Sequence, residues 1–391
     1  MRIAVYTNAY KPVISGVVNT ISLLRQGLMA RGHEVIVFAP DFYGHRDQEP
    51  GIYRYPSVDL TRQVRFPVAV PWSPRLMRVV RSFHPDVIHT HHPFVLGPLA
   101  LRTARALDVP VVYTFHTQYE QYAHYVPLPP NLVKRLTRWR IRRFAAAADV
   151  VTTPAESIRE LLRSYGVDKT IFILPNPIDL SGFTLQEGRT IRRQLGLAPQ
   201  DLVLISVGRL GVEKNLSFMV EAFALMVQIA PDLPLRLVLV GAGPEEPRLR
   251  EAATALGLEG RLILAGSVPY PTVPSYLAAA DLFVMTSITE VKPLVLLEAM
   301  AAGLPIVAVR ASGTVDTVTD GREGVLTPLD REAFAGAAVA LLRDDGRRAA
   351  MIERGRETAN FYALDRVTDQ LLEVYAQAID QHRGAGGEGR Q

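Results

Sequence analysis

Short apolar runs alternate with longer amphipathic stretches along this chain, and no other feature of the sequence restricts its fold as much. In the first half, buried strands are predicted at residues 2–7, 34–39, 86–91, 110–116, 149–153 and 170–174. Helices are predicted between them, at residues 16–31, 94–107, 131–147 and 155–165. Continuously apolar strands separated by helices are typical of a parallel sheet that is covered on both faces. The first half is therefore predicted to be a doubly wound α/β domain.

The same pattern starts again after residues 176–200, a polar stretch that we interpret as a hinge. Strands are predicted at residues 202–207, 235–240, 261–265, 282–286 and 305–309, and helices at 214–230, 245–256, 272–280, 295–302 and 331–343. The predicted fold class is α/β, with two Rossmann-like, doubly wound domains that face each other across a cleft. In such sheets, ligands bind at the carboxyl ends of the strands.

The predicted domain boundaries follow from these two patterns. A first Rossmann-like domain is predicted at residues 1–178, and a second at residues 179–355. Residues 356–383 are predicted to contain a C-terminal helix that crosses back to the N-terminal domain. The Gly-rich residues 384–391 are predicted to form a disordered tail.

The composition excludes several classes of protein. A chain of 391 residues with 48% apolar residues is long enough for two well-packed domains. The chain has no cysteine, which excludes a disulfide scaffold, a thiolate metal site and a cysteine nucleophile. No apolar run approaches the roughly 20 residues of a membrane helix, and the N-terminus lacks the features of a signal peptide. A cytoplasmic protein is expected.

The charges are unevenly distributed. Residues 1–170 hold 22 lysines and arginines against 12 acidic residues, whereas the rest of the chain holds 21 against 27. The predicted helix 131–147 is basic and contains a tryptophan, a composition that suits an anionic membrane surface. The residues expected to contact the membrane there are Lys134, Arg135, Arg138, Trp139 and Arg142. The alternative is an ordinary solvated helix face. No nucleic-acid partner is expected, because no recognition motif accompanies the basic residues.

Two glutamates lie eight residues apart near the end of the second pattern. Glu290 is predicted on a loop after a strand, and Glu298 within an apolar helix. Burying a carboxylate is costly unless it is paired, and a vicinal diol is a suitable partner because one carboxylate accepts both hydroxyl protons. The alternative is that Glu298 pairs with a surface arginine.

Two cations and two glycines follow predicted strands. Arg209 and Lys214 leave a strand just before a helix, which suits a diphosphate. Taken alone, they would be interpreted as solvated surface cations, but their occurrence beside Glu290 and Glu298 favours a diphosphate site. Gly16 opens the first helix, where backbone can approach phosphate. Gly241 follows a second-domain strand, where a tight turn is the alternative interpretation.

Histidines end two of the predicted strands. His116 is expected to point toward the cleft, although a single histidine at the end of a strand is often structural. His89, His91 and His92 form a second group, and a His-x-His pair can bind metal. We expect no metal site, because no carboxylate lies at ligand spacing nearby. The chain also lacks an Asp-x-Asp motif, so Arg209 and Lys214 would neutralise the diphosphate instead.

Residues 290–305 resemble the Glu-x7-Glu signature and the Glu-Ala-Met-Ala-x-Gly-x-Pro run of family-4 retaining glycosyltransferases, which have the GT-B fold. The resemblance extends over nearly the whole chain, and it implies that residues 1–178 form the acceptor-side domain and residues 179–355 the nucleotide-sugar-binding domain. It implies that Glu298 holds the ribose hydroxyls of a nucleotide-sugar and that Glu290 contacts the transferred sugar. It implies a catalytic set of His116, Arg209, Lys214 and Glu290. It also implies that the donor is bound by Gly16, Arg209, Lys214, Gly241, Glu290, Lys292, Leu294 and Glu298. The family usually has glycine where this chain has Pro293, which cannot donate a backbone N–H.

Residues 116–125 are similar to the acceptor-side loop of bacterial diacylglycerol glycosyltransferases. This similarity implies acceptor contacts at Tyr119, Glu120 and Tyr125, a lipid acceptor, and peripheral binding to the inner face of the cell membrane. UDP-glucose or UDP-galactose is the favoured donor, as a substrate rather than a cofactor. The family also implies retention of the anomeric configuration, and the lack of an Asp-x-Asp motif favours a metal-independent enzyme. Three alternatives stay open: a GDP-mannose-dependent mannosyltransferase acting on phosphatidylinositol or a glycolipid, a nucleotide-sugar epimerase, and a non-catalytic binding module.

Overall fold

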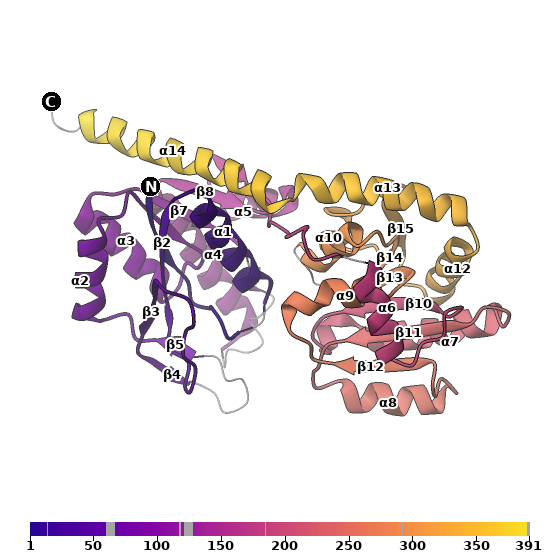
Figure 1. Cartoon of the computed structure of the whole chain (residues 1–391). Helices are drawn as coiled ribbons and strands as arrows, with labels where there is room; N and C mark the ends of the chain where they lie inside the picture. The colour runs from indigo at the N-terminus through magenta and orange to yellow at the C-terminus, as the bar shows by residue number, and fades with distance from the viewer. Residues whose placement is uncertain are drawn as a thin grey trace. The chain divides into compact units, whose positions relative to one another are not determined.

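The protein was studied as a computed structural model, which describes the whole chain except residues 14, 60–66, 117–118, 121–127, 184, 289, 291 and 389–391. The chain divides into two compact units (Figure 1). The first unit contains Met1–Pro177 and Leu364–Gln391, and the second contains Ile178–Ala363. The chain passes between the units twice, and these two passages lie together, because Ile178 and Ala363 form a β-bridge.

The first unit is built on a seven-stranded parallel sheet with the order β3-β2-β1-β6-β7-β8-β9. Its strands are β1 (Arg2–Tyr6), β2 (Glu34–Pro40), β3 (Ile52–Tyr55), β6 (Val87–Thr90), β7 (Val111–Thr114), β8 (Val150–Thr153) and β9 (Ile171–Ile173). A separate antiparallel pair is formed by β4 (Ser57–Asp59) and β5 (Pro67–Ala69). The strand order reverses direction between β1 and β6, so the carboxyl ends of these two strands form the switch point of this sheet.

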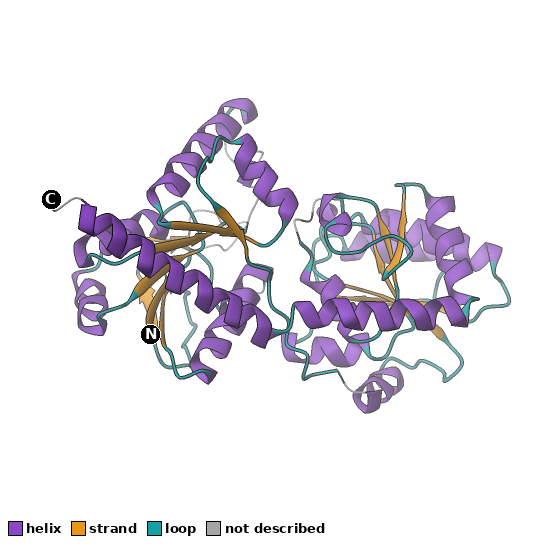
Figure 2. Ribbon diagram, turned by 90° about the horizontal axis from the view of Figure 1, so that it is seen from above, coloured by secondary structure: helices purple, strands orange, loops and turns teal. Residues whose placement is uncertain are grey.

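Helices cover both faces of this sheet (Figure 2). They are α1 (Gly16–Ala30), α2 (Pro74–Phe83), α3 (Leu96–Leu107), α4 (Pro130–Ala147), α5 (Glu156–Ser164) and α14 (Leu364–Glu388). The C-terminal helix α14 packs against α1, and its apolar residues Val367, Leu371 and Tyr375 are fully buried in the core of the first unit. At the same contact, Arg31 forms ion pairs with Asp365 and Asp369.

The second unit has a six-stranded parallel sheet with the order β12-β11-β10-β13-β14-β15. Its strands are β10 (Leu202–Val207), β11 (Leu235–Val240), β12 (Leu262–Gly266), β13 (Leu282–Met285), β14 (Ile306–Val309) and β15 (Gly324–Thr327). This is the strand order of a dinucleotide-binding Rossmann domain, and its switch point lies between β10 and β13.

The α-helices of the second unit are α6 (Leu185–Gln194), α7 (Leu216–Ile229), α8 (Glu246–Ala255), α9 (Val273–Leu277), α10 (Leu294–Ala301), α11 (Ser312–Val315), α12 (Arg331–Leu342) and α13 (Asp345–Phe361). Two 3-10 helices, η2 (Val212–Lys214) and η3 (Tyr270–Thr272), precede α7 and α9. Two apolar clusters, one on each face of the sheet, form the core of this unit.

The two Rossmann-like halves confirm the predicted fold class. Some elements differ from the sequence-based prediction. The predicted hinge at 176–200 contains α6, whose Gly188 packs so closely on α9 that a Cβ atom would lie 2.3 Å from the carbonyl oxygen of Ala278. The short strands β3 and β15 and helix α2 were not predicted. Helix α14 continues to Glu388, within the segment predicted to be a disordered tail.

The units divide after Pro177, one residue before the predicted boundary, and Asp345–Phe361 is one continuous helix of the second unit. None of the helices in the described part of the chain is long and apolar enough to cross a membrane.

Candidate active site

The switch point of the second sheet brings together three of the predicted donor residues, Arg209, Lys214 and Glu290. Strands β10 and β13 are neighbours, with Leu204 opposite Leu282 and Ile205 opposite Phe283. Their carboxyl ends open onto a small pocket lined by residues that include Gly208, Arg209, Lys214, Thr286 and Ser287. Sequence analysis predicted Arg209 and Lys214 in such a position, because both follow β10 directly.

Arg209 is the exposed cation of this pocket. Its guanidinium makes no hydrogen bond or ion pair with any residue that the structure describes, and it is therefore available to an anionic ligand. Its backbone is held by the loop after β11, because the N–H of Leu210 donates to the carbonyl oxygen of Ala242 over 3.0 Å. Gly241 makes this packing possible: a Cβ atom there would lie 1.9 Å from the carbonyl oxygen of Gly208. The close loop packing supplies a structural reason for glycine at 241.

Lys214 is held in place by two hydroxyl groups that sequence analysis did not predict. Thr286 donates a hydrogen bond to the carbonyl oxygen of Lys214 over 2.9 Å, and Ser287 donates to that of Glu213 over 3.0 Å. Both hydroxyls directly follow β13. Asn215 then turns the chain in the left-handed conformation, with φ of 53°, before α7 begins. The only sequence signal for these hydroxyls is their position at the carboxyl end of a buried strand.

Glu290 forms an ion pair with Lys214. Both side chains are about three-quarters buried. The backbone of Glu290 lies against Gly313, where a Cβ atom would come within 2.4 Å of the Glu290 carbonyl oxygen. Two residues predicted to act on the donor are thus in direct contact.

Glu298 is buried in the middle of α10 and accepts a hydrogen bond of 2.6 Å from the hydroxyl of Tyr270. The predicted alternative was a surface arginine, but the observed partner is this phenol. Burial raises the pKa of Glu298 above its ordinary value, while the hydrogen bond from Tyr270 partly opposes that increase. Tyr270 was missed by sequence analysis, since it lies 28 residues away from Glu298 on η3.

Lys292 and Leu294 flank Pro293 at the start of α10. The Lys292 ammonium donates to the Tyr362 hydroxyl over 2.9 Å and to the carbonyl oxygen of Asp316 over 3.1 Å. It also lies 4.8 Å from the centre of the Tyr362 ring. Its side chain therefore holds α10 against the chain after α13. Pro293 is the N-cap residue, so Leu294 carries the first N–H group that the helix itself leaves unsatisfied.

In the first unit, the buried His91 and His92 follow β6 at the switch point, and the partly buried His116 follows the neighbouring strand β7. The N–H of Asn8 donates to Nδ1 of His92 over 3.1 Å, and Nδ1 of His91 lies 2.9 Å from Nε2 of His116. Burial lowers the pKa of His92 to about 4 and that of His116 to about 3, and it lowers the pKa of His91 well below its ordinary value. These imidazoles are neutral at pH 7. His116 can therefore donate or accept a hydrogen bond without carrying charge.

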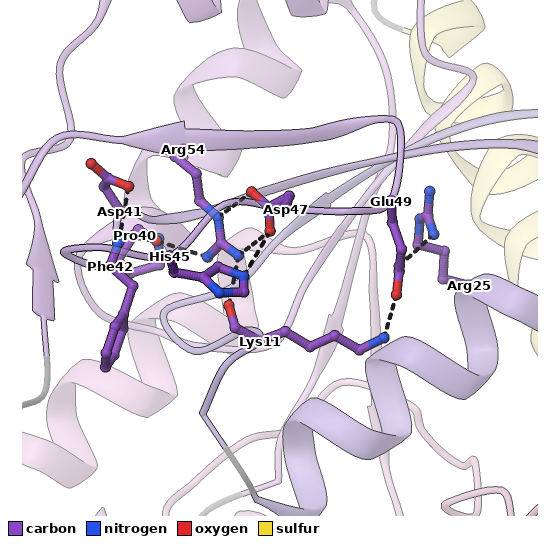
Figure 3. A network of polar contacts seen from close by, with 9 residues as sticks. All are labelled: Lys11, Arg25, Pro40, Asp41, Phe42, His45, Asp47, Glu49 and Arg54. Carbon is purple, nitrogen blue, oxygen red and sulfur yellow. Dashed lines mark hydrogen bonds and ion pairs between the residues drawn. The ribbon is translucent and has the colours of Figure 1, made fainter. Parts of the chain in front are cut away.

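Gly16 begins α1, and Ser15 caps the helix by accepting a hydrogen bond from the N–H of Val18. The chain leading to this helix is anchored by polar contacts from the β2–β3 connection (Figure 3). Arg54 pairs with Asp47 and donates to the carbonyl oxygen of Lys11 over 2.6 Å. Lys11 forms an ion pair with Glu49.

The remaining histidine of the predicted group, His89, is used inside the first unit. Its ring nitrogens lie 2.8 Å from the Tyr375 hydroxyl of α14 and 2.7 Å from the Thr114 hydroxyl. In the part of the chain that the structure describes, no three His, Cys, Asp or Glu side chains are grouped so that they could hold a metal ion.

Helix α4 exposes a mixed apolar and basic surface. Leu132, Leu136 and Trp139 are 41%, 50% and 54% exposed, and their spacing places them on one helix face. Arg143 lies over the Trp139 ring, with its guanidinium carbon 5.1 Å from the ring centre. We define the α4 surface as the exposed residues Leu132, Arg135, Leu136, Trp139, Arg142 and Arg143.

The other residues predicted to contact an acceptor or a membrane are in different surroundings. Arg138 is paired with Glu120 by two hydrogen bonds, so these two residues hold each other. Tyr119 packs edge-on against Phe94. Lys134 is half-buried on α4. Tyr125 lies outside the described residues.

Comparison with known proteins places these features in a family. Residues 14–181 match the model "Glycosyltransferase Family 4", and residues 188–358 match "Glycosyl transferases group 1". The alpha-monoglucosyldiacylglycerol synthase of Streptococcus pneumoniae is 32% identical, over 79% of this chain and 71% of that protein. A GDP-mannose-dependent alpha-mannosyltransferase of Corynebacterium glutamicum is 28% identical, over 97% and 89%.

A solved structure supports the same fold. The structure of Anabaena HepE in complex with UDP superposes with a TM-score of 0.74 at 20% identity, and the match covers 96% of this chain and all of that one. At this identity the likeness concerns the fold alone. Together with the family matches and the 32% identical relative, it shows that this chain is an enzyme of the family-4 glycosyltransferases and has the GT-B fold.

Proposed function

We propose that the protein is a retaining hexosyltransferase that moves a sugar from a nucleoside-diphosphate donor to a diacylglycerol-type lipid at the membrane surface. UDP-glucose or UDP-galactose is the favoured donor. The observation that carries the proposal is the group of charges around one Rossmann switch point, where Arg209 and the paired Lys214 and Glu290 lie near the carboxyl ends of β10 and β13. The lipid acceptor is supported by the S. pneumoniae relative, whose name describes a synthase of monoglucosyldiacylglycerol.

The two cations suit the leaving group of the reaction. A departing nucleoside diphosphate gains negative charge, and positive groups that are already in place stabilise that charge without reorganisation. Arg209 offers a planar guanidinium with several N–H donors, and Lys214 offers a compact ammonium on a loop fixed by Thr286 and Ser287. The N-terminus of α10, with the N–H of Leu294, adds a further favourable dipole. In this proposal these groups take the place of a metal ion.

The two glutamates suit the hydroxyl groups of the donor. In the proposal, the Glu298 carboxylate accepts the two ribose hydroxyls, and Glu290 accepts hydroxyls of the transferred sugar. A buried carboxylate without a charged partner is costly, and a diol that donates two hydrogen bonds offsets that cost. Donor binding would also compete with Glu290 for Lys214, because the diphosphate and Glu290 are both anions.

The configuration at the anomeric carbon is retained if the acceptor hydroxyl attacks from the side on which the diphosphate leaves. The bond between the anomeric carbon and the phosphate oxygen breaks, the bond to the acceptor oxygen forms, and the acceptor proton passes to the leaving phosphate. No protein nucleophile is required. His116, which is neutral, is assigned to a hydrogen bond with the donor sugar.

The α4 surface is the proposed contact with the membrane. Its exposed leucines and tryptophan can enter the headgroup region, while Arg135, Arg142 and Arg143 face anionic lipid. Each such cation near the membrane surface contributes about 1 kcal/mol. This arrangement would bring the enzyme to an acceptor that is not soluble in water, and it supports a peripheral location at the inner membrane face.

The decisive experiment supplies radiolabelled UDP-glucose, UDP-galactose and GDP-mannose in separate reactions, each with vesicles that contain diacylglycerol. Transfer of label from a UDP-sugar into the lipid phase, with retained configuration in the product, is the expected result. Transfer from GDP-mannose alone would support the alternative that the C. glutamicum relative favours. Conversion of the free nucleotide-sugar without an acceptor would indicate an epimerase. No reaction with any donor would overturn the lipid acceptor, and a trapped covalent glycosyl-enzyme would overturn the mechanism.

A further inference from the structure

We propose that Tyr270 is a positioning residue for nucleotide recognition: its hydroxyl holds the Glu298 carboxylate in the orientation that receives the ribose diol. This inference rests on the proposed function, because it concerns the site assigned there to the donor nucleotide. It adds a residue that no sequence motif identified. In this role Tyr270 acts through Glu298 and need not touch the transferred sugar.

The geometry brings together two elements that are distant in sequence. Tyr270 is the first residue of η3, in the chain that follows β12, and it packs against the apolar cluster around α10. Glu298 projects from α10 and is only 7% exposed. The phenol reaches one carboxylate oxygen, Oε1, at 2.6 Å. Among the residues that the structure describes, this hydroxyl is the only hydrogen-bond partner of the Glu298 side chain.

The Glu298 carboxylate has enough acceptor sites to bind the Tyr270 hydroxyl and the two ribose hydroxyls at the same time. An ionised carboxylate has two oxygens and about four lone-pair sites, all acceptors. Tyr270 occupies one site on Oε1 and so fixes the rotation of the carboxylate, while Oε2 has no hydrogen-bond partner among the described residues. Glu298 is buried on a helix whose other residues, including Leu294, Leu297 and Ala299, belong to an apolar core cluster. The remaining acceptor sites can therefore be satisfied by a ligand with two adjacent hydroxyl groups.

The phenol also favours the charged form of Glu298. Burial disfavours a carboxylate, whereas a hydrogen bond donated to it has the opposite effect on its pKa. Among the described residues, the charged groups that act on this pair are the Glu298 carboxylate itself and Asp179, which lies near Tyr270. Burial and these two carboxylates raise the pKa of Tyr270, so the phenol keeps its proton and remains a donor at physiological pH. Without the hydroxyl, the pKa of Glu298 is expected to rise further.

The test compares Tyr270→Phe with the wild-type enzyme by calorimetric titration with UDP and GDP between pH 6 and 9. With the nucleotide that the wild-type enzyme binds, we expect the variant to bind about tenfold more weakly at pH 7, the size of effect for a hydrogen bond to a charged group. Because only the ionised carboxylate accepts both ribose hydroxyls, the affinity of the variant should recover as the pH rises. A loss caused only by altered packing would not depend on pH in this way.

Two controls separate positioning from general damage. Tyr276→Phe removes a hydroxyl from another partly buried tyrosine of the same apolar cluster, and this hydroxyl makes no hydrogen bond with a described residue. It should bind nucleotide like the wild-type enzyme. The second control uses 2′,3′-dideoxy-UDP or its guanosine counterpart, which lacks the diol. Tyr270→Phe should weaken binding of this ligand much less than binding of the parent nucleotide.

The outcomes distinguish this inference from the proposed function. If the wild-type enzyme binds neither UDP nor GDP, the proposed donor site itself is contradicted. If the wild-type enzyme binds one of them and Tyr270→Phe binds it equally well with the same pH dependence, only the role of Tyr270 is overturned. An equal loss of affinity for the nucleotide and for its dideoxy analogue would likewise overturn it, because the effect would then not pass through the ribose hydroxyls.

Discussion

The ammonium of Lys214 and the carboxylate of Glu290 form an ion pair although the two residues are 76 positions apart in the sequence. Both lie at the carboxyl edge of the second sheet: Lys214 ends the 3-10 helix η2 that follows β10, and Glu290 lies between β13 and α10. The pair joins the two sides of the switch point. It also keeps a flexible lysine within the pocket, so that less conformational entropy is lost when a diphosphate binds.

Lys214→Ala should therefore lower kcat strongly. We expect a loss of about 100-fold to 1000-fold, the usual cost of removing one group that stabilises developing negative charge. Lys214→Arg should recover part of this activity, because it keeps the charge. The control is Arg248→Ala, which removes a cation that is 69% exposed on the same unit. Steady-state rates of the three variants with saturating donor check this prediction, and a Lys214→Ala enzyme as fast as the control would contradict it.

Gly241→Ala should disturb the Arg209 loop. The new methyl group would lie 1.9 Å from the carbonyl oxygen of Gly208, and the φ of 138° at this position is itself unfavourable for alanine. We expect a lower melting temperature together with weaker nucleotide binding. Gly336→Ala is the matched control, because this helical glycine has open space around it. It should raise the stability by about 0.5–1 kcal/mol. Thermal denaturation and nucleotide titration of both variants give the comparison.

Lys292→Met should destabilise the second unit while leaving nucleotide affinity within about twofold. The substitution keeps an unbranched stem but removes the hydrogen bonds to Tyr362 and Asp316 and the cation over the Tyr362 ring. The loss is expected to be about 1–3 kcal/mol in the free energy of unfolding. Urea denaturation and titration with UDP test the two halves of the prediction. A large loss of affinity at unchanged stability would show that the Lys292 side chain itself contacts the donor.

Stability should decrease as the pH falls below neutral. Burial lowers the pKa of His89 to about 3, whereas an unfolded histidine titrates near 6.5. Above pH 6.5, His89 is neutral in both the folded and the unfolded protein, so burying it costs no stability through protonation. As the pH falls from 6.5 toward 3, His89 is protonated in the unfolded state before it is protonated in the folded state. Its contribution lowers the free energy of unfolding by about 1.4 kcal/mol per pH unit. His92 adds to the trend until its own pKa of about 4 is reached.

Urea unfolding of His89→Gln between pH 7.5 and 5 isolates this contribution. The variant should show a shallower dependence of unfolding free energy on pH than the wild-type protein, whatever its absolute stability. His84→Asn is the control, because His84 is exposed and asparagine tolerates its left-handed φ of 48°. Its pH dependence should match that of the wild-type protein. Equal slopes for all three proteins would mean that His89 titrates alike in both states.

The α4 surface predicts a measurable loss of membrane affinity. Replacing Arg135 and Arg143 by serine should weaken binding to anionic vesicles about 30-fold, since each cation contributes about 1 kcal/mol. The same double replacement of Arg102 and Arg105, two exposed arginines of α3, changes the net charge equally and should have a smaller effect. Vesicle sedimentation measures both variants. If the two double variants lose affinity equally, net charge rather than the α4 surface governs binding.

Regular elements were predictable because their signal is local. The runs at 202–207 and 235–240 are strands with those same bounds, since continuous β-branched and leucine residues have few other stable arrangements than a buried parallel strand. The helix α6 was missed because its sequence, Leu-Gln-Glu-Gly-Arg-Thr-Ile-Arg-Arg-Gln, is mostly polar. Gly188 and Ile191 of this helix pack inside the second unit. No local sequence pattern shows this packing.

The sequence by itself determined the α/β fold class, the doubling of the Rossmann pattern, and the presence of Glu290, Glu298, Arg209 and Lys214 after or beside strands. Only the tertiary structure decided their partners. It paired Lys214 with Glu290, placed Tyr270 against Glu298, and turned Lys292 toward Tyr362. The physical reason is that hydrophobic periodicity is read over a few neighbouring residues. Hydrogen bonds and ion pairs instead depend on which strand ends the sheet order brings together, across separations of 28 to 76 residues in these three pairs.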